Sequence, residues 1–496
     1  MGSPADRSVP RSAADDASRG SAIKLGAELL GRLLALATTL LVARVLGVAD
    51  FGLFAVLSGI AVLVAELSDL GLQGIAVQSL VSGALPLSAL VRAKARLTAG
   101  LLAIASVAAF PQALSWSAAL VPAAWRPSWE AALGHGPLLF PLVVYSATSN
   151  WTELLGIALR VRGRRGLEAA IIVTFRAVGL VLVAAALWSG TGLRGLVWAL
   201  AVSALPPLAL GVVFLRANAT SESRPPRMEI GVGRTLKASA PLAVNGVLAI
   251  LSLRIELLTL ALFRGSLEAG LFAAALKVIE LMNVLPAAIA AGAMPALTRE
   301  AASGADPVRR RTAATVALLA APAAAGLVLV APGVVALLGE GYDAAAVPLR
   351  ILAPALLALF MNTVLLHALI AAGRARRVPL LTAARVAAAT ALALVLVPRF
   401  GAAGAAAGFL LAELLLLALS TRACAGAGFE VPVARPLLAA LGVTVPMAAA
   451  VALAGAGTIA SVLVGVVTYG LTLMIARRLA PRLVPGMTSE AAPGRP

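Results

Sequence analysis

Basic side chains inside long apolar segments are the residues of this chain whose type and position could do chemistry. They are Arg32, Arg176, Arg254, Lys277 and Arg385. A basic side chain at the centre of a membrane helix costs roughly 2.5–3.5 kcal/mol on insertion scales, so it usually faces a wet cavity or a charged partner. A guanidinium binds phosphate oxygens in pairs and stays charged in a partly dry site. These bases therefore predict an anion-binding cavity, with Arg32, Arg254 and Lys277 as its central residues.

Acids near these bases leave a second interpretation open. Two base–acid pairs have the spacing of one helix face: Glu28 with Arg32, and Lys277 with Glu280. Arg254 and Glu256 are two residues apart and point in different directions, so each needs a partner elsewhere. If every base is neutralised in this way, the charges only hold helices together. Arg176 and Arg385 fall in corresponding segments of the two halves of the chain and favour that structural role.

The intramembrane acids also have a possible transport role of their own. Glu66, Glu256 and Glu280 lie in apolar segments, and so do Glu153 and Glu413. A carboxylate in a cavity of low dielectric can carry a proton or bind Na⁺. We therefore name Glu66, Glu256 and Glu280 as candidates for H⁺ or Na⁺ coupling. Charge pairing with the bases is the alternative.

Composition excludes most other classes of protein. Hydrophobic residues make up 61% of the chain, charged residues 12%, and mean hydropathy is +0.98, which indicates a polytopic membrane protein. The formal charge of +18 does not indicate a nucleic-acid partner, because the basic residues lie between apolar segments. Cys424 is the single cysteine, so no intrachain disulfide or thiolate metal site is expected. No lysine completes a phosphate-binding loop, and no cofactor is expected.

The apolar segments predict about 14 membrane spans, since one span needs roughly 20 apolar residues. The predicted spans are 21–43, 51–69, 90–111, 136–159, 167–188, 193–215, 236–262, 267–297, 312–331, 346–371, 379–397, 401–421, 436–454 and 458–476. Residues 1–20 and 479–496 are expected to be polar tails, the first of them disordered, and 216–235 a linker. Pro286 interrupts the eighth span and predicts a kink there.

Basic residues alternate along the chain and set the expected orientation. They concentrate in alternate loops, at 92–96, 160–165, 216–237, 299–311, 374–377, 422–435 and 477–482. The intervening loops hold scattered single charges such as Arg44 and Arg264. Cytoplasmic loops of membrane proteins are enriched in Lys and Arg, so both termini are expected to be cytoplasmic.

A repeated joint indicates two related halves. The segment from Gly47 to Ala55, GVADFGLFA, returns from Gly265 to Ala273 as GSLEAGLFA, 218 residues further along the chain. In both places an apolar segment ends, a short turn carries one acid, and a second apolar segment begins at Gly-Leu-Phe-Ala. Internal repeats of this kind are typical of transporters.

These residues resemble a known family. The sequence ARVLG at 43–47, followed by DFGLFA at 50–55, is similar to the junction of the first two spans in polysaccharide exporters and O-antigen flippases. These belong to the multidrug/oligosaccharidyl-lipid/polysaccharide (MOP) superfamily. The basic turn at 160–165 and its counterpart at 373–377 fit the same pattern.

The resemblance implies an all-α polytopic membrane protein with two pseudo-symmetric six-helix lobes and a C-terminal helix pair. The lobes would be residues 21–215 and 236–423, and the extra pair would lie within 424–478. The spans that begin at 21, 51, 236 and 267 would line a central cavity. The implied partners are a lipid-linked glycan and membrane lipids, with polysaccharide polymerase and glycosyltransferases nearby, and the protein is expected to be monomeric.

The sequence thus predicts a flippase of the bacterial plasma membrane, and not an enzyme. It would bind a polyprenyl-pyrophosphate-linked oligosaccharide and move it across the membrane by alternating access. The main alternative is a multidrug antiporter of the same superfamily, which would need an acid-dominated cavity. A membrane glycan ligase is disfavoured, because the sequence offers no large external loop for catalysis.

Overall fold

The computed structural model describes residues 11–82, 86–108, 134–217, 232–303, 306–455 and 457–479. Within these ranges the chain is helical and has no strand, which confirms the all-α prediction. Among the described residues, eight helices are long and apolar enough to cross a membrane. The number is nine if the bent pair of α13 (Ala346–Leu352) and α14 (Ala355–Ala371) forms one span. The count of 14 spans stays a prediction.

Three apolar helical stretches are more than twice as long as a membrane span. They are Gly26–Asp69, Gly246–Ala301 and Arg377–Ala425, with 44, 56 and 49 residues. Each contains a glycine with non-helical backbone angles, at Gly47, Gly265 or Gly401. Each glycine lies at or beside a boundary between two predicted spans, so one continuous stretch can hold two spans that meet at a joint.

The repeat seen in the sequence is present in the backbone. Gly47 has φ 73° and ψ 175°, and Gly265 has φ 83° and ψ −175°. Essentially only glycine adopts this region of backbone space, because a Cβ atom would clash with the chain. The helices α1 (Arg11–Asp69) and α10 (Val232–Met282) therefore turn in the same way at corresponding positions.

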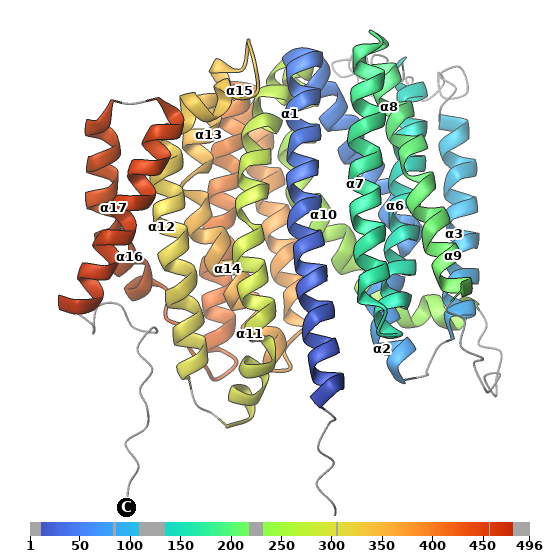
Figure 1. Ribbon diagram of the computed structural model, residues 1–496. Helices are drawn as coiled ribbons and strands as arrows, with labels where there is room; N and C mark the ends of the chain where they lie inside the picture. Colours follow the sequence, from blue (N-terminus) through green and yellow to red (C-terminus); the bar gives the residue numbers. More distant parts are fainter. Residues whose placement is uncertain are drawn as a thin grey trace, which may run out of the picture. The chain divides into compact units, whose positions relative to one another are not determined.

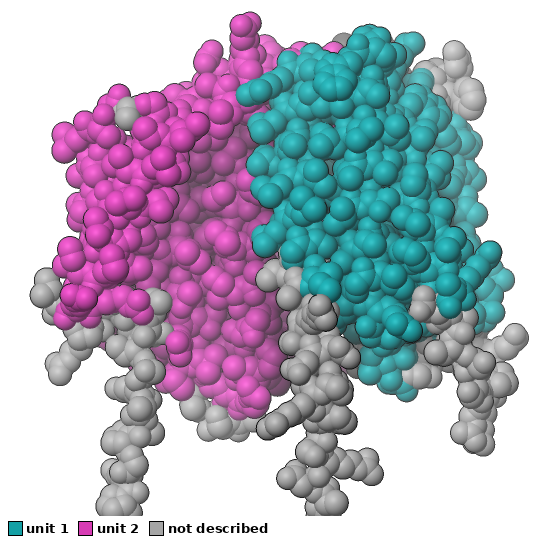
Figure 2. Space-filling model, in the orientation of Figure 1, with its two compact units in different colours: residues 1–46, 57–247 teal, residues 47–56, 248–496 magenta. Residues whose placement is uncertain are grey.

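The chain divides into two compact units, shown in two colours in Figure 2. The first consists of residues 1–46 and 57–247, and the second of residues 47–56 and 248–496. The short stretch 47–56 contains the first joint and groups with the second unit, where Phe51 packs edge-on against Tyr342 with ring centroids 6.0 Å apart.

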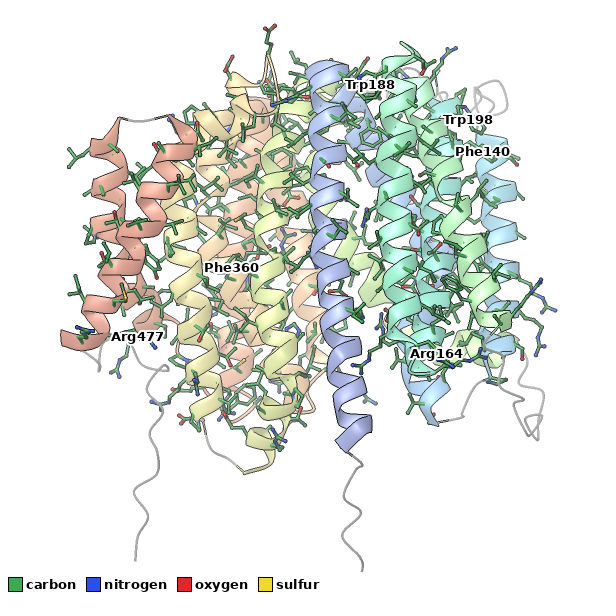
Figure 3. The ribbon with its side chains drawn as sticks, in the orientation of Figure 1. Phe140, Arg164, Trp188, Trp198, Phe360 and Arg477 are labelled. Carbon is green, nitrogen blue, oxygen red and sulfur yellow. The ribbon has the colours of Figure 1, made fainter. Side chains whose placement is uncertain are left out.

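In the first unit, helix α6 (Gly136–Val161) is central (Figure 1). It packs against the other helices of this unit: α2 (Leu72–Ser82), α3 (Leu87–Ala108), α7 (Arg165–Trp188), α8 (Gly192–Ser203) and α9 (Leu205–Ala217). Figure 3 shows Arg164 at one end of this bundle and Trp188 and Trp198 at the opposite end. The basic turn between α6 and α7 thus lies at the end of the bundle opposite Trp188 and Trp198, and the predicted orientation of the chain stays a prediction.

In the second unit, α12 (Pro307–Ala336) and α14 form the centre. Helix α14 is mostly apolar, and its residues Leu356, Phe360 and Leu365 are completely buried. A helix of this composition is stable when other helices enclose it. It packs against α11 (Val284–Ser303), α12 and α15 (Arg377–Ala425).

The C-terminal pair α16 (Ala434–Ala454) and α17 (Thr458–Leu479) packs on α12 (Figure 1). The Tyr469 hydroxyl donates a hydrogen bond of 2.6 Å to the carbonyl of Leu318 and so ties α17 to α12. Many apolar side chains of α17 remain exposed, among them Ile459, Val466 and Met474. Such a surface is suited to contact with lipid.

The structure can be compared with the predictions for the N-terminal tail, the linker and the kink at Pro286. Helix α1 begins at Arg11, so residues 11–20 are helical where the sequence predicted part of a disordered tail. Residues 11–20 contain no proline that would end a helix, and they continue directly into the apolar helix. Most of the predicted linker, residues 218–231, lies outside the described residues.

The kink predicted at Pro286 is present. Helix α10 ends at Met282 and α11 begins at Val284, so the break falls at Asn283, about one turn before the proline.

Candidate functional site

The two arms of α10 bring a basic cluster together in the second unit. Arg254 lies 11 residues before the joint at Gly265, and Lys277 lies 12 residues after it. At 1.5 Å per residue, both side chains start about 17 Å from the joint and so lie at the same depth. Half of the hydrocarbon core of a bilayer is about 15 Å. This symmetry of arm lengths explains why residues 23 apart in sequence share one site.

Glu280 lies between the two bases. Its Oε2 accepts a hydrogen bond of 2.7 Å from the Lys277 ammonium, as the spacing predicted, and its Oε1 is 3.1 Å from Arg254 Nη1. The Arg254 contact is an ion pair without hydrogen-bond alignment, so the donors of the guanidinium are only partly used. The side chains of Arg254, Lys277 and Glu280 are 18%, 40% and 23% exposed. The cluster is thus accessible and carries one positive charge in excess.

A second cluster of the same unit is closed to solvent. The Arg385 guanidinium donates from Nε to Glu413 at 2.6 Å and from Nη1 to the carbonyl of Ser252. The Asn362 amide donates to the other oxygen of Glu413 at 2.9 Å. Arg385 and Glu413 are each only 2% exposed. This arrangement joins α10, α14 and α15 and agrees with the structural role predicted for Arg385.

Glu256 belongs to the buried cluster and not to the accessible one. It is fully buried, and its nearest base is Arg385, whose Nη2 is 3.8 Å away. Neither carboxylate oxygen has a hydrogen-bond partner among the described residues. The prediction that Arg254 and Glu256 need separate partners is confirmed. The role of Glu256 in ion coupling stays a prediction.

In the first unit, Glu168 joins three helices. Arg160 Nε at the end of α6 donates to its Oε1 at 2.9 Å, and Lys24 Nζ of α1 lies 3.1 Å from the same oxygen. The other oxygen, Oε2, is buried without a hydrogen-bond partner in the described chain. Glu168 was not among the residues predicted from the sequence. It follows the basic turn at 160–165 closely, and an acid at this position can pair with the arginines of the turn.

A cavity of about 310 Å³ with both charged and apolar lining residues opens beside Glu168. Its wall includes the carboxylates of Glu28 and Glu153, the guanidinium of Arg176 and the ring of Phe175. Arg176 is exposed, and its guanidinium carbon lies 5.3 Å from the centre of the Phe175 ring. Carboxylates accept and guanidiniums donate hydrogen bonds, so this wall can satisfy a ligand that carries hydroxyl groups.

Arg32 lies on α1 and is exposed. It makes no ion pair with any residue that the structure describes, and Glu28 pairs instead with Lys24 at 3.5 Å. Glu28 is four residues from both bases, so the spacing alone did not decide between them. The structural alternative, in which Glu28 neutralises Arg32, is therefore not what the described residues show.

Glu66 is half-buried on α1, close to a buried ion pair that the sequence did not reveal. The Lys94 ammonium is fully buried and bonds to the carboxylate of Asp69. The prediction that Lys94 belongs to a basic loop is therefore wrong. Helix α3 begins at Leu87, so Lys94 lies two turns inside it and reaches the end of α1.

The long apolar helices and the charges within them are those of a multi-pass membrane protein. Residues 164–347 match the family model of polysaccharide biosynthesis proteins. No curated protein sequence matches the chain significantly.

Solved structures extend the comparison to nearly the whole chain. The lipid II flippase MurJ in an inward closed conformation superposes with a TM-score of 0.70 at 12% identity, over 92% of this chain and 98% of its own. A multidrug resistance MATE family transporter of the MOP superfamily, inward-facing, gives a TM-score of 0.57 at 15% identity, over 80% and 96% of the two chains. A variant of the Vibrio cholerae MATE transporter VcmN gives 0.53 at 14% identity, over 83% and 95%. The expected resemblance to the MOP superfamily is confirmed.

Proposed function

We propose that this protein is a flippase that moves a polyprenyl-pyrophosphate-linked oligosaccharide across the bacterial plasma membrane for the synthesis of a surface polysaccharide. The accessible cluster of Arg254, Lys277 and Glu280 is the observation that carries this proposal. Two bases against one acid leave a positive charge at mid-membrane depth, where an unpaired base is costly. A pyrophosphate supplies the missing negative charge.

The exposed guanidinium of Arg32 adds a third donor group within an apolar helix. Arginine suits this ligand because its planar fork meets two phosphate oxygens at once. In this mechanism the pyrophosphate and glycan cross through the protein while the polyprenyl tail stays in the bilayer. The two halves would alternate between inward and outward access, as transporters built from repeats do. No covalent step is required, and both termini would be cytoplasmic.

The lipid content of a strain that lacks this protein tests the proposal. We expect polyprenyl-pyrophosphate oligosaccharide to accumulate in the lipid extract, where mass spectrometry would identify the glycan. Expression of the intact protein should remove the accumulated species, whereas the variant with Arg32→Ala and Arg254→Ala should not. An unchanged lipid profile in the deletion strain would contradict the proposal.

A cation antiporter is the second candidate, because Glu256 is a buried acid without a hydrogen-bond partner in the described chain and the MATE transporters share the fold. An antiporter of this kind would exchange its substrate for H⁺ or Na⁺. A deletion strain with normal lipids and new sensitivity to cationic compounds would support it. Loss of transport on Glu256→Gln, with transport retained in the Arg32→Ala and Arg254→Ala variant, would do the same.

A further inference from the structure

A groove on the first unit is unrelated to the charge clusters described above. It runs between α3, α6 and α9 and has a volume of about 530 Å³. Seven of its nine lining side chains are apolar or aromatic, among them Trp151, Leu155 and Val212. The other two are Arg162, at the end of α6, and Arg216, at the end of α9. The groove is therefore apolar along its length and basic at one end.

Specific contacts build both ends of this groove. At the deep end, Trp151 Nε1 donates a hydrogen bond of 3.0 Å to the Thr98 hydroxyl and so fixes the indole against α3. At the basic end, Arg162 Nη1 donates to the carbonyl of Leu215 at 3.3 Å and joins α6 to α9. Arg216 is exposed beside it.

The Leu155 side chain of α6 packs closely on α9 at Gly211. A Cβ atom at this position would lie 2.8 Å from the Leu155 side chain. The two helices therefore close the floor of the groove next to Val212. The groove is a formed feature of the bundle and not a gap between separate elements.

The length of the groove matches one leaflet of a bilayer. Trp151 and Arg162 are 11 residues apart on α6, which corresponds to about 16 Å along the helix axis. Half of the hydrocarbon core is about 15 Å. With Trp151 near the middle of the membrane, both arginines would reach the level of the lipid head groups.

We propose that this groove binds an anionic glycerophospholipid from the leaflet on the basic side. One acyl chain would lie along Leu155 and Val212, and the phosphate would accept hydrogen bonds from Arg162 and Arg216. Basic pockets between helices at the membrane surface have the chemistry that recognises anionic head groups. The charge at one end and the apolar wall of one leaflet's length together favour a phospholipid over a soluble anion.

Native mass spectrometry of the full chain tests this proposal. The purified protein would be offered equal amounts of phosphatidylglycerol and phosphatidylcholine. We expect retention of phosphatidylglycerol, and roughly fivefold weaker retention for Arg216→Gln, because one arginine near the head groups is worth about that factor. Arg164→Gln is the matched control: Arg164 is exposed at the same end of the bundle but does not line the groove.

A second pair of variants tests the apolar wall without any change of charge. Val212→Trp should fill the groove and reduce phosphatidylglycerol retention, whereas Val213→Trp should not, since Val213 is exposed and outside the groove. Equal retention of both lipids, or no effect of Val212→Trp and Arg216→Gln, would mean only annular lipid and would overturn the proposal. Retention of a polyprenyl phosphate in place of phosphatidylglycerol would overturn it as well.

Discussion

The two charge clusters of the second unit contain similar residues and differ in access. Arg385, Glu413 and Glu256 are at most 2% exposed. The Arg385 guanidinium donates from Nε to Glu413 and from Nη1 to a backbone carbonyl, and its Nη2 is buried without a hydrogen-bond partner in the described chain. Arg254, Lys277 and Glu280 are 18–40% exposed and keep a surplus of donors. An arginine in an apolar helix is therefore not informative by itself. Its access to solvent separates a ligand-binding group from a structural one.

The two clusters also differ in formal charge: the accessible cluster is positive and the buried cluster is negative. With all groups ionised, the accessible cluster has two bases and one acid, and the buried cluster has one base and two acids. An anionic ligand would complete the first. In the second, the Glu256 carboxylate has no hydrogen-bond partner in the described chain.

The largest expected effect comes from breaking the buried cluster. Arg385→Met leaves Glu413 buried without its base, and the loss of one partner of a buried pair costs about 3–5 kcal/mol in the free energy of unfolding. Arg254→Met should cost less than about 1 kcal/mol, because its pair is partly exposed. Unfolding of both variants in detergent would measure the difference. Equal losses would mean that the two clusters have the same role.

The second largest effect is expected when the two accessible bases are removed, and it should appear as a weaker affinity for pyrophosphate. Arg254→Gln combined with Lys277→Gln removes two charged donors, each worth roughly 1.5–3 kcal/mol. Binding of inorganic pyrophosphate, measured by titration calorimetry, should weaken about 100-fold or more.

The control for that experiment is Arg264→Gln with Arg374→Gln. It removes two basic charges of the same unit from exposed positions outside the cluster. Its affinity for pyrophosphate should stay within about twofold of the original, since exposed charges at a distance are screened. A similar loss in both double variants would show that only total charge matters.

A smaller effect of the opposite sign is expected at the acid between the bases. Glu280→Gln keeps the shape of the side chain and removes its charge, so pyrophosphate should bind about fivefold more tightly, in line with about 1 kcal/mol for a partly exposed pair. The same titration tests this. Weaker binding would mean that Glu280 mainly positions the bases.

The smallest effect is expected at Glu256. Its carboxylate has no hydrogen-bond partner in the described chain, so Glu256→Gln should change the free energy of unfolding by less than about 1 kcal/mol and leave transport intact. Glu413→Gln is the comparison, because its carboxylate is bonded to both Arg385 and Asn362 and should be more sensitive. A stable Glu256→Gln variant without transport would favour ion coupling at this residue.

Local spacing predicted part of these clusters. Lys277 and Glu280 are three residues apart, which predicted that they share one helix face. Arg254 and Glu256 are two residues apart, which predicted that they have different partners. The glycine joints were also visible, because the repeat preserved the residue type that their backbone angles require. Helix geometry over a few residues carries this information in the sequence.

Contacts between distant helices could not be predicted in the same way. Arg385 reaches Glu256 from 129 residues away, and this depends on how α15 packs against α10. The choice of Glu28 between Lys24 and Arg32, which are equally spaced from it, depends on the position of Glu168 on another helix. The burial of Lys94 depends on where α3 begins.

The rate of glycolipid flipping tests the central claim most directly. The protein would be reconstituted in liposomes that contain a polyprenyl-pyrophosphate oligosaccharide, and the glycan reaching the other leaflet would be measured by its access to an added glycosidase. We predict a loss of about 100-fold for Arg254→Gln with Lys277→Gln, and no loss for Arg264→Gln with Arg374→Gln. Flipping at the original rate by the first variant, in a folded protein, would contradict the assignment of the accessible cluster as the pyrophosphate site.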